Sequence, residues 1–394
     1  MPGPLKIDIY TLVFPPDQAS TAHLVGALVE EFTSASCDVN VFSCAPHYGS
    51  VSNTKAARFE LLASGARVHR QNMSAKSSGT GRRLISWFRF STVSALRGLK
   101  SRRADVSLVI SPPLFVGLSA ALVKAVRKTP YVYVVQEAFA DIVEQLKILP
   151  KPAVSVLRIV ERFIYRQAAG VVAISSAMAR MIEQSGVPSS KIHVIENFPL
   201  GSVTSFPKVP GEWTASYLGN VGPAQDLDTL VKAARILKST PWRFVVAGNG
   251  TGIEELRTKT SDLPNFVVRE PMDLEAALAL TASSSVGLVL QSVGTGKSAL
   301  PSKLYQIMSL GIPVAAVCDQ DSGVAESLRE TQAGFAVLPG DAQGLAQCLE
   351  DLRLGVSKGD SMGQLGKSYV EKNANRVVCA QSYLELLHSV AKPR

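Results

Sequence analysis

Hydrophobic residues along the chain gather in short, β-branched runs that alternate with longer amphipathic stretches. In the first half, the runs predict strands at 7–13, 39–43, 106–111, 131–136, 170–174 and 193–195. The stretches between them predict helices, among them 21–32, 154–167 and 176–184. This alternation is typical of a parallel sheet covered by helices on both faces.

The alternation stops at residues 197–213, which carry three prolines and two glycines without periodicity and therefore indicate a linker. A second series follows, with strands predicted at 214–218, 244–247, 266–268, 286–290, 314–317 and 335–338 and helices at 227–237 and 274–281. The chain closes with a helical pattern from about residue 367 to residue 390.

We therefore expect an α/β fold of two tandem Rossmann-like, doubly wound domains. The first covers residues 1–198 and the second 214–366, with a linker at 199–213 and a C-terminal helix at 367–394 that packs back towards the first domain. In open α/β sheets, ligands bind outside the carboxyl ends of the strands. A cleft between the two domains is thus the expected active site.

Length and composition agree with this division. A chain of 394 residues exceeds what one hydrophobic core usually supports, and with 46% hydrophobic residues each domain can bury its own core. Uninterrupted apolar stretches are too short for a membrane span. The start, "MPGPLKIDIY", lacks the pattern of a signal peptide, so we expect a cytoplasmic protein.

The five cysteines form no C-x-x-C pair, and the five histidines show no zinc-ligand spacing. We therefore expect neither a disulfide framework nor a structural zinc site. No metal and no cofactor are expected.

The net charge of +9 is confined to the first half of the chain: residues 1–198 hold 23 Lys and Arg against 13 Asp and Glu, whereas 199–394 hold 18 against 19. Residues 71–104 contain eight basic residues and no acid. A solvated helix face, an anionic lipid surface and a nucleic acid are three readings of this stretch, and no nucleic-acid-binding motif accompanies it. The candidate membrane surface consists of Arg82, Arg83, Trp87, Phe88, Arg89 and Phe90.

Three glycine-rich turns follow predicted strands of the second domain. "SVGTGKSALPSK" (292–303) resembles half of a P-loop, but Gln291 stands where the first glycine is needed, so the segment predicts a loop leading into the helix "PSKLYQIMSLG". Ser302 and Lys303 at the start of that helix form a candidate anion site, although an ordinary capped helix with a solvated lysine fits equally. With "VAGNGTG" and "SYLGNVGPAQDLDTL", the turns indicate a bound nucleotide.

In their order along the chain, several segments resemble the retaining glycosyltransferases of family 4, which have the GT-B fold, and in particular the branch that builds capsular and exopolysaccharide repeat units. They include "SPPLFVGLSAALVKAVRKTPYVYVVQEAFADI", "YLGNVGPAQDLDTLVKAARIL", "FVVAGNGTGIEELR" and "LPSKLYQIMSLGIPVAA". The resemblance implies a UDP- or GDP-sugar donor, a polyprenyl-diphosphate-linked glycan acceptor at the inner membrane surface, and a metal-independent, retaining transfer.

The chain departs from this family at charged positions of the donor site. An arginine and a lysine usual on the Gly219 turn are replaced by Asn220 and Gln225, and two glutamates are replaced by Ser298 and Gln306. A departing diphosphate still needs its negative charge stabilised, so Lys303 and then Lys297 are the expected substitutes. The candidate donor-binding residues are Gly219, Asn220, Gln225, Gly248, Arg269, Pro271, Lys297, Ser302, Lys303 and Gln306.

On the acceptor side, Gln136 occupies a position where many relatives have a histidine, and Glu137 and Asp141 follow it. A carboxylate here would stabilise an oxocarbenium-like transition state or accept the acceptor proton, although local capping explains both acids equally well. These three are the candidate catalytic residues, and the candidate acceptor-side residues are Asp17, Ser20 and Thr21.

Two other functions remain open at this point. A nucleotide-sugar epimerase shares the fold, but this sequence offers no pair of histidines for it. A degenerate, non-catalytic scaffold would explain the substitutions at Asn220, Gln225, Ser298 and Gln306.

Overall fold

The computed structural model describes residues 3–46, 57–72, 80–145, 147–201 and 212–392, with the side chains of 80–84 left undescribed. The chain forms two compact units. One comprises Met1–Asn197 and Arg376–Arg394, and the other comprises Phe198–Asn375.

The first unit is built on an eight-stranded sheet with the order β3-β4-β2-β1-β5-β6-β7-β8. All neighbouring strands are parallel except β3 and β4. The strands are β1 (Lys6–Tyr10), β2 (Asp38–Cys44), β3 (Phe59–Leu61), β4 (Arg67–Gln71), β5 (Val106–Ile110), β6 (Tyr131–Val135), β7 (Gly170–Ala173) and β8 (Ile192–Val194).

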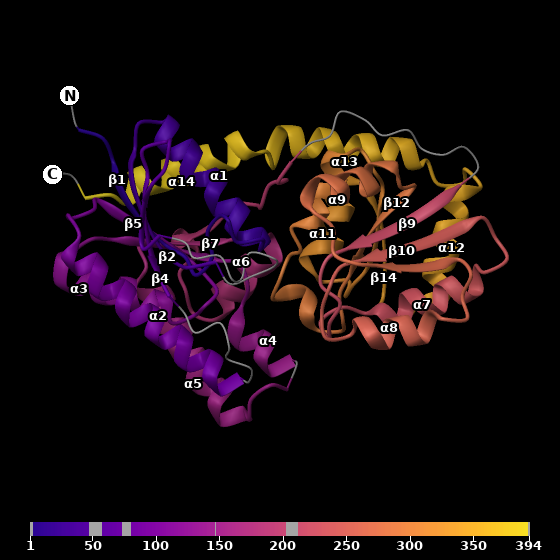
Figure 1. Ribbon diagram of the computed structural model, residues 1–394, viewed down its shortest axis with the longest axis horizontal. Helices are drawn as coiled ribbons and strands as arrows, with labels where there is room; N and C mark the ends of the chain where they lie inside the picture. Colours follow the sequence, from indigo (N-terminus) through magenta and orange to yellow (C-terminus); the bar gives the residue numbers. More distant parts are fainter. Residues whose placement is uncertain (1–2, 47–56, 73–79, 146, 202–211, 393–394) are drawn as a thin grey trace. The chain divides into compact units, whose positions relative to one another are not determined.

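Helices cover both faces of this sheet (Figure 1). The helices are α1 (Ser20–Ser34), α2 (Thr80–Lys100), α3 (Val116–Arg127), α4 (Phe139–Gln145), α5 (Lys151–Gln167), α6 (Ser176–Gln184), the short η2 (Ser189–Lys191) and α14 (Arg376–Val390). Right-handed crossovers place α1 and α3 on opposite faces, because β2 and β6 lie on opposite sides of the β1–β5 pair. α2 and α5 contact α3, and α14 contacts α1.

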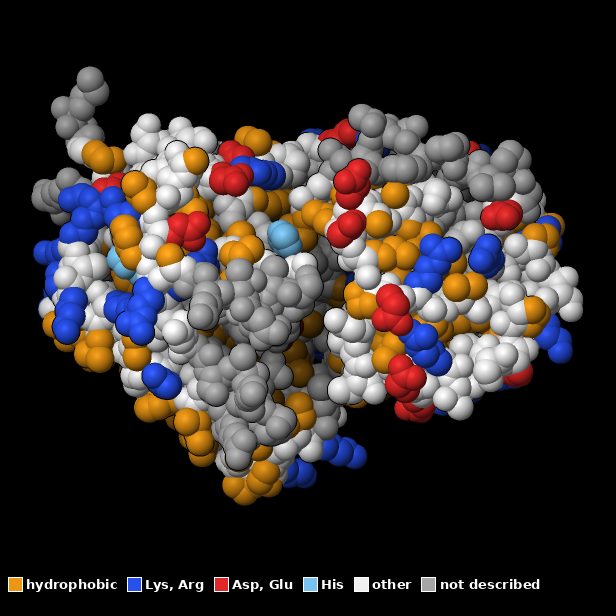
Figure 2. Space-filling model, in the orientation of Figure 1, with side chains coloured by type: hydrophobic (Ala, Val, Ile, Leu, Met, Phe, Trp, Pro, Cys, Tyr) orange, Lys and Arg blue, Asp and Glu red, His pale blue; other side chains and the backbone are white. Residues whose placement is uncertain are grey.

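The outer side of α2, α3 and α5 remains exposed. On the face shown in Figure 2, hydrophobic side chains and lysines or arginines line the edge where Figure 1 shows these helices. Within the described residues, none of the helices combines the length and the apolar composition that crossing a membrane requires.

The second unit has a parallel six-stranded sheet with the order β11-β10-β9-β12-β13-β14. Its strands are β9 (Trp213–Leu218), β10 (Trp242–Ala247), β11 (Phe266–Arg269), β12 (Val286–Leu290), β13 (Val314–Val317) and β14 (Gly334–Val337). Its helices are α7 (Leu227–Ile236), α8 (Ile253–Thr260), α9 (Leu274–Ser283), η3 (Thr295–Lys297), α10 (Lys303–Ser309), α11 (Gly323–Thr331), α12 (Ala342–Arg353) and α13 (Gly359–Asn373).

Two local features differ from the sequence expectation. The strands β3 and β4 were not predicted, because β3 is short and largely exposed and carries little hydrophobic periodicity. The closing helical pattern is two helices, α13 and α14, separated near Ala374, which is fully buried. At this break the chain returns from the second unit, which contains α13, to the first unit, which contains α14. Most of the predicted linker, residues 202–211, lies outside the described residues.

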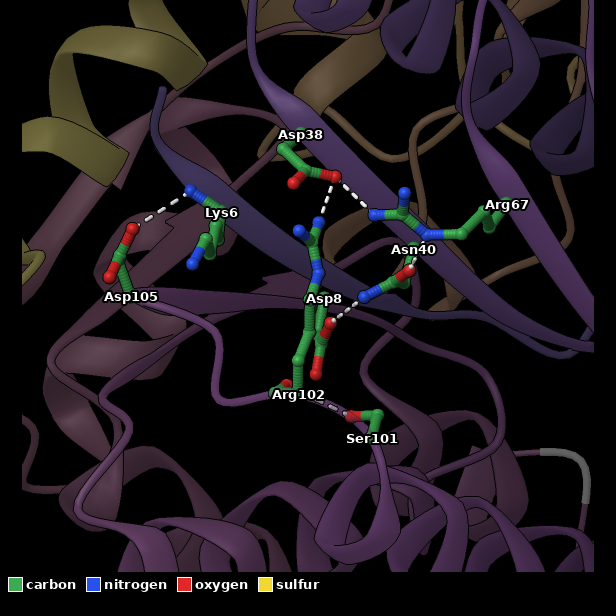
Figure 3. Close-up of polar contacts among 8 residues, drawn as sticks. All are labelled: Lys6, Asp8, Asp38, Asn40, Arg67, Ser101, Arg102 and Asp105. Atoms are coloured by element: carbon green, nitrogen blue, oxygen red, sulfur yellow. Dashed lines mark hydrogen bonds and ion pairs between the residues drawn. The ribbon is translucent and has the colours of Figure 1, made fainter. Parts of the chain in front are cut away.

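A polar network joins the amino ends of β1, β2 and β4 (Figure 3). Asn40 donates to the buried carboxylate of Asp8 at 2.8 Å and accepts from Arg67 at 2.7 Å. Asp38 forms ion pairs with Arg67 and Arg102. The network lies at the edge opposite the carboxyl ends of the strands, so it fixes strand register rather than forming part of a ligand site.

We predict that Asp8→Asn gains stability relative to the wild type as the pH rises. Burial raises the pKa of Asp8 to about 6, so the folded state holds this proton more tightly than the unfolded chain does. The free energy of unfolding of the wild type therefore falls between about pH 4 and pH 6, and the variant lacks this loss. The difference between the two should change by about 2 kcal/mol from pH 4 to pH 7, measured by denaturant unfolding.

Asp262→Asn is the contrasting control. The ion pair with Arg235 lowers the pKa of Asp262, so the sign of the effect is reversed and this variant should lose relative stability as the pH rises. Parallel pH profiles for Asp8→Asn and the wild type would contradict the prediction.

Candidate active site

The strand order of the second unit reverses between β9 and β12, which places a topological switch point at their carboxyl ends. Gly219 directly follows β9, and the loop that begins at Gln291 follows β12. Ligands of doubly wound sheets bind at such a point, so the residues around it form the candidate site.

Two glycine turns pack backbone against backbone at this edge. Gly219 donates its amide to the carbonyl of Ala247 at 3.0 Å. A side chain at Gly248 would place its Cβ 1.8 Å from the carbonyl oxygen of Gly219, and Gly248 has a φ of +156°. Glycine is therefore required at Gly248 for the turns after β9 and β10 to meet.

Lys303 reaches this turn from the start of α10. Its Nζ lies 3.6 Å from the centroid of the Tyr217 ring, and a Cβ on Gly219 would approach the same Nζ to 2.9 Å. The residue as a whole is partly exposed, but protein encloses the ammonium group closely. Burial alone, with no carboxylate contributing among the described residues, lowers the pKa of Lys303 to about 7. This cation is placed to bind an anion at the Gly219 turn.

A pocket opens beside Lys303, between the sheet and the helices α9 and α10. It holds about 420 Å³ including its open mouth. Lys303 and Gln306 supply charged and amide groups, and the rest of the lining is largely apolar: Ser216, Leu218, Leu274, Ala277, Leu278, Thr281, Leu288 and Ile307. An apolar pocket with a few polar groups at one side is the usual form of a small-molecule site.

Asn220 and Gln225 bond to each other. The amide of Asn220 donates to Oε1 of Gln225 at 3.2 Å, and the same oxygen accepts from the backbone of Gly222 at 3.1 Å. The pair therefore closes the turn between β9 and α7 and brings no charge to it.

The remaining predicted donor residues surround the same edge. Arg269 and Pro271 are exposed at and after the end of β11, and the Arg269 carbonyl accepts from the amide of Gly248 at 3.4 Å. Ser302 precedes α10 and makes no side-chain capping bond. Lys297 lies in η3, and its ammonium forms an ion pair with Asp321, so it is already partly neutralised.

Gln306 holds the chain near the start of the second unit. Its Oε1 accepts from the amide of Leu200 at 2.9 Å, and its Nε2 donates to the carbonyl of Gly201 at 2.9 Å. The predicted contact of this amide with a ribose would compete with these bonds. A glutamate could accept from Leu200 but could not donate to Gly201, which gives a physical reason for glutamine here.

Like Gln306, Gln136 of the first unit uses its side-chain amide to bond the chain near the passage between the units. It is buried at the end of β6, and its amide forms two reciprocal hydrogen bonds with the amide of Asn197, at 3.1 and 2.9 Å. Both polar atoms of the Gln136 side chain are engaged in these bonds, so in this structure Gln136 holds the side chain of Asn197 in place.

The two predicted acids after β6 have different surroundings. Glu137 is exposed, whereas Asp141 on α4 forms an ion pair with Arg158 of α5 at 2.8 Å. Arg158 also pairs with Glu144. Asp141 thus joins α4 to α5.

Glu161 of α5 is a buried acid that the sequence pattern did not single out. Its Oε1 accepts from the amide of Ala140 at 3.3 Å, at the start of α4. Burial raises the pKa of Glu161 to about 7. The signal available in the sequence was an acid at a position where the helical period demands an apolar residue.

The loop after β1 and the first turn of α1 contain the predicted acceptor-side residues. Asp17 is fully buried, and its amide donates to the carbonyl of Phe14 at 3.1 Å. Ser20 and Thr21 lie in the first turn of α1, where helical amides have no intrahelical acceptor. The loop after β1 lies at the switch point of the first sheet, between β1 and β5.

The candidate membrane surface on α2 needs a correction. Trp87 and Phe90 are only 6% and 1% exposed and face the core, so they are not surface residues. Phe88 and Arg89 are exposed, and the side chains of Arg82 and Arg83 lie outside the described ones. Aromatic residues of an amphipathic helix supply its buried side as readily as a lipid-facing side, which the sequence pattern alone does not distinguish.

Comparisons with known proteins agree with the two-unit architecture. Residues 21–197 match the model of a glycosyl transferase 4-like domain, and residues 213–353 match the model of glycosyl transferases group 1. The probable glycosyltransferase WbjE of Pseudomonas aeruginosa is 24% identical over 72% of this chain and 74% of its own. WcaI of Escherichia coli K12, which is named a putative colanic acid biosynthesis glycosyl transferase, is 23% identical over 84% of this chain and 88% of its own.

Solved structures support the same fold. A sucrose-phosphate synthase from Thermosynechococcus elongatus superimposes with a TM-score of 0.78 at 15% identity, covering 98% of this chain and 99% of its own. HepE from Anabaena, in complex with UDP-glucose, has a TM-score of 0.70 at 16% identity, covering 98% of this chain and 100% of its own.

We predict that Gln306→Glu destabilises the second unit. The carboxylate would face the carbonyl of Gly201 and leave it without a donor, at a cost of about 1–3 kcal/mol in the free energy of unfolding. Chemical denaturation measures this difference. Gln364→Glu is the matched control, because Gln364 is exposed on α13 and bonds only weakly, at 3.4 Å, to Ser368. Equal effects of the two substitutions would contradict the role assigned to Gln306.

Proposed function

Because the chain belongs to the glycosyltransferases that combine a 4-like domain with a group 1 domain, we propose that it transfers a sugar from a UDP- or GDP-sugar to a lipid-linked glycan. The role we assign to it is the biosynthesis of cell-surface polysaccharide. The name of WcaI supports this role, and the complex of HepE with UDP-glucose supports the class of donor.

The observation that carries the proposal is the ammonium group of Lys303. It lies against Gly219 at the switch point of the second sheet, beside a largely apolar pocket, with its pKa lowered by burial. A diphosphate bound at the Gly219 turn would place negative charge beside the ammonium of Lys303. The ribose and base would then extend along the loops after β10 and β11, near Gly248, Arg269 and Pro271.

In the proposed reaction, the bond between the anomeric carbon and the diphosphate oxygen breaks while the acceptor hydroxyl forms the new glycosidic bond on the same face. Lys303 stabilises the charge that develops on the leaving diphosphate. Glu137 stabilises the oxocarbenium-like sugar or takes the proton of the acceptor hydroxyl. Retention of configuration and independence of a metal ion or cofactor are part of this proposal.

The acceptor we propose is a glycan on a polyprenyl diphosphate, presented at the inner face of the cell membrane. Incubating the protein with UDP- and GDP-sugars, with and without such an acceptor, tests the assignment. Nucleotide release that depends on the acceptor is the expected result. Sugar isomerisation without acceptor would instead identify an epimerase, and failure to bind any nucleotide would identify a non-catalytic scaffold.

We predict that Lys303→Ala weakens the binding of the nucleoside diphosphate by roughly 10- to 100-fold, the usual range for loss of a charged hydrogen bond. In the wild type, affinity should fall as the pH rises through about 7, because the Lys303 ammonium then loses its proton. The variant should lack this pH dependence. Isothermal titration calorimetry with UDP and GDP between pH 6 and pH 8.5 measures both effects, a range chosen to span the lowered pKa of about 7.

Lys297→Ala serves as the comparison. The ion pair with Asp321 already compensates the charge of Lys297, so its loss should weaken binding less. If Lys303→Ala retains the affinity of the wild type, or if the two variants lose affinity equally, the assignment of Lys303 is wrong.

A further inference from the structure

Exposed apolar side chains gather on three neighbouring helices of the first unit. Of the 21 large hydrophobic residues exposed among the described residues, eight lie on α2, α3 and α5. They are Ile85, Phe88, Leu96, Leu122, Val126, Val156, Ile159 and Phe163, which together define the outer helical face. Single exposed apolar residues are ordinary, but a contiguous group of them marks an interaction surface.

Packing and hydrogen bonds hold the three helices together as one layer. Phe88 of α2 packs edge-on against Phe115, just before α3, with ring centroids 6.3 Å apart. Ser119 of α3 donates to the carbonyl of Ser91 in α2 at 2.6 Å. Lys124 of α3 donates to the carbonyl of Gln167 in α5 at 2.5 Å. The outer helical face is thus a preformed surface.

The charge on these helices is almost entirely positive. α2 contains five Lys and Arg, α3 two and α5 four, against a single acid, Glu161, which is buried. These helices therefore carry an excess of ten positive charges, one of which, on Arg158, is compensated by Asp141 and Glu144 of α4. Several of these cations donate to carbonyl oxygens, as Arg97 does to Arg70 and Arg127 to Leu99, which leaves their charge uncompensated.

Helix α5 combines exposed apolar and exposed basic side chains on one side. The sequence pattern alone did not assign α5 to a binding surface. Val156, Ile159 and Phe163 recur at intervals of three and four on its exposed side, and Arg162 and Arg166 are exposed beside them. Its opposite side is buried against the sheet. Exposed aliphatic and aromatic side chains bordered by basic ones are the composition of a helix that lies in a membrane interface.

We propose that the outer helical face of α2, α3 and α5 binds a bilayer that carries anionic headgroups. The lysines and arginines contact lipid phosphates, and the apolar side chains enter the boundary between headgroups and acyl chains. A nucleic acid would use the charge but would leave the exposed valine, isoleucine and leucine side chains without an apolar partner, which favours lipid. The proposal rests on the proposed function, because a lipid-linked acceptor lies in such a bilayer.

Sedimentation of the full chain with vesicles tests the proposal without nucleotide or acceptor. The protein should bind vesicles that contain phosphatidylglycerol and should not bind vesicles of phosphatidylcholine alone. Arg162→Glu/Arg166→Glu and, separately, Ile159→Ser/Phe163→Ser should each weaken binding by at least about tenfold. All four side chains are exposed, and thermal unfolding of each variant checks that its fold is intact.

Matched controls lie in the second unit. Lys238→Glu/Arg243→Glu makes the same change of charge, and Leu354→Ser/Val356→Ser removes comparably exposed apolar side chains. Both should bind vesicles as the wild type does. Equal loss of binding in a control and its α5 counterpart, equal binding to neutral vesicles, or no vesicle binding at all would overturn the proposal.

Two further outcomes would also overturn it: preference for a single-stranded RNA over the anionic vesicles, or an α5-dependent dimer seen by light scattering. The binding of UDP and GDP separates this proposal from the proposed function. Nucleotide binding with no vesicle binding would refute the membrane surface alone, whereas vesicle binding with no nucleotide binding would refute the transferase.

Discussion

The close contact between the turns after β9 and β10 is the constraint on which the candidate donor site depends. Because Gly248 lies against the carbonyl oxygen of Gly219, neither turn can move without the other. The position of Gly219 in turn sets where the ammonium of Lys303 meets the Tyr217 ring. A cation enclosed by an aromatic face and by backbone, and without a carboxylate to neutralise it, is costly to keep charged, which is why its pKa falls to about 7. An anionic ligand would relieve that cost.

Two glutamines hold the segment through which the chain passes from the first unit to the second. Gln136 pairs with Asn197, the last residue of the first unit before this passage, and Gln306 holds Leu200 and Gly201 in the second. At both positions the chain differs from the family it resembles. At position 306, where the family has a glutamate, an amide can donate and accept at once, whereas a carboxylate can only accept, so glutamine suits the binding of Leu200 and Gly201. Asn220 and Gln225 bond to each other in the same way.

The sequence was sufficient to predict most of the fold, because short apolar runs mark twelve of the fourteen strands that the described residues form. The short strands β3 and β4 and the break at Ala374 depend on tertiary contacts that no local pattern records. In the site, Lys303 was predicted from its place at the start of a helix. Its contact with Tyr217 and the pairing of Asp141 with Arg158 could not be predicted, because each joins residues from different elements. The burial of Glu161 could have been inferred from the helical period of α5, but its contact with Ala140 could not.

Local sequence patterns also could not show which residues of α2 form its surface. A stretch rich in arginine and aromatic residues does not reveal which side of its helix is buried. The structure buries Trp87 and Phe90 and leaves Ile85, Phe88 and Leu96 outside. Helices α3 and α5 then continue an apolar and basic surface that no single stretch of sequence contains. Exposed apolar and basic side chains of the first unit therefore gather on one layer of helices, whereas in the second unit the ammonium of Lys303 lies against the turn after β9. In the proposed function, the layer of helices serves the lipid-linked acceptor and the turn after β9 serves the nucleotide donor.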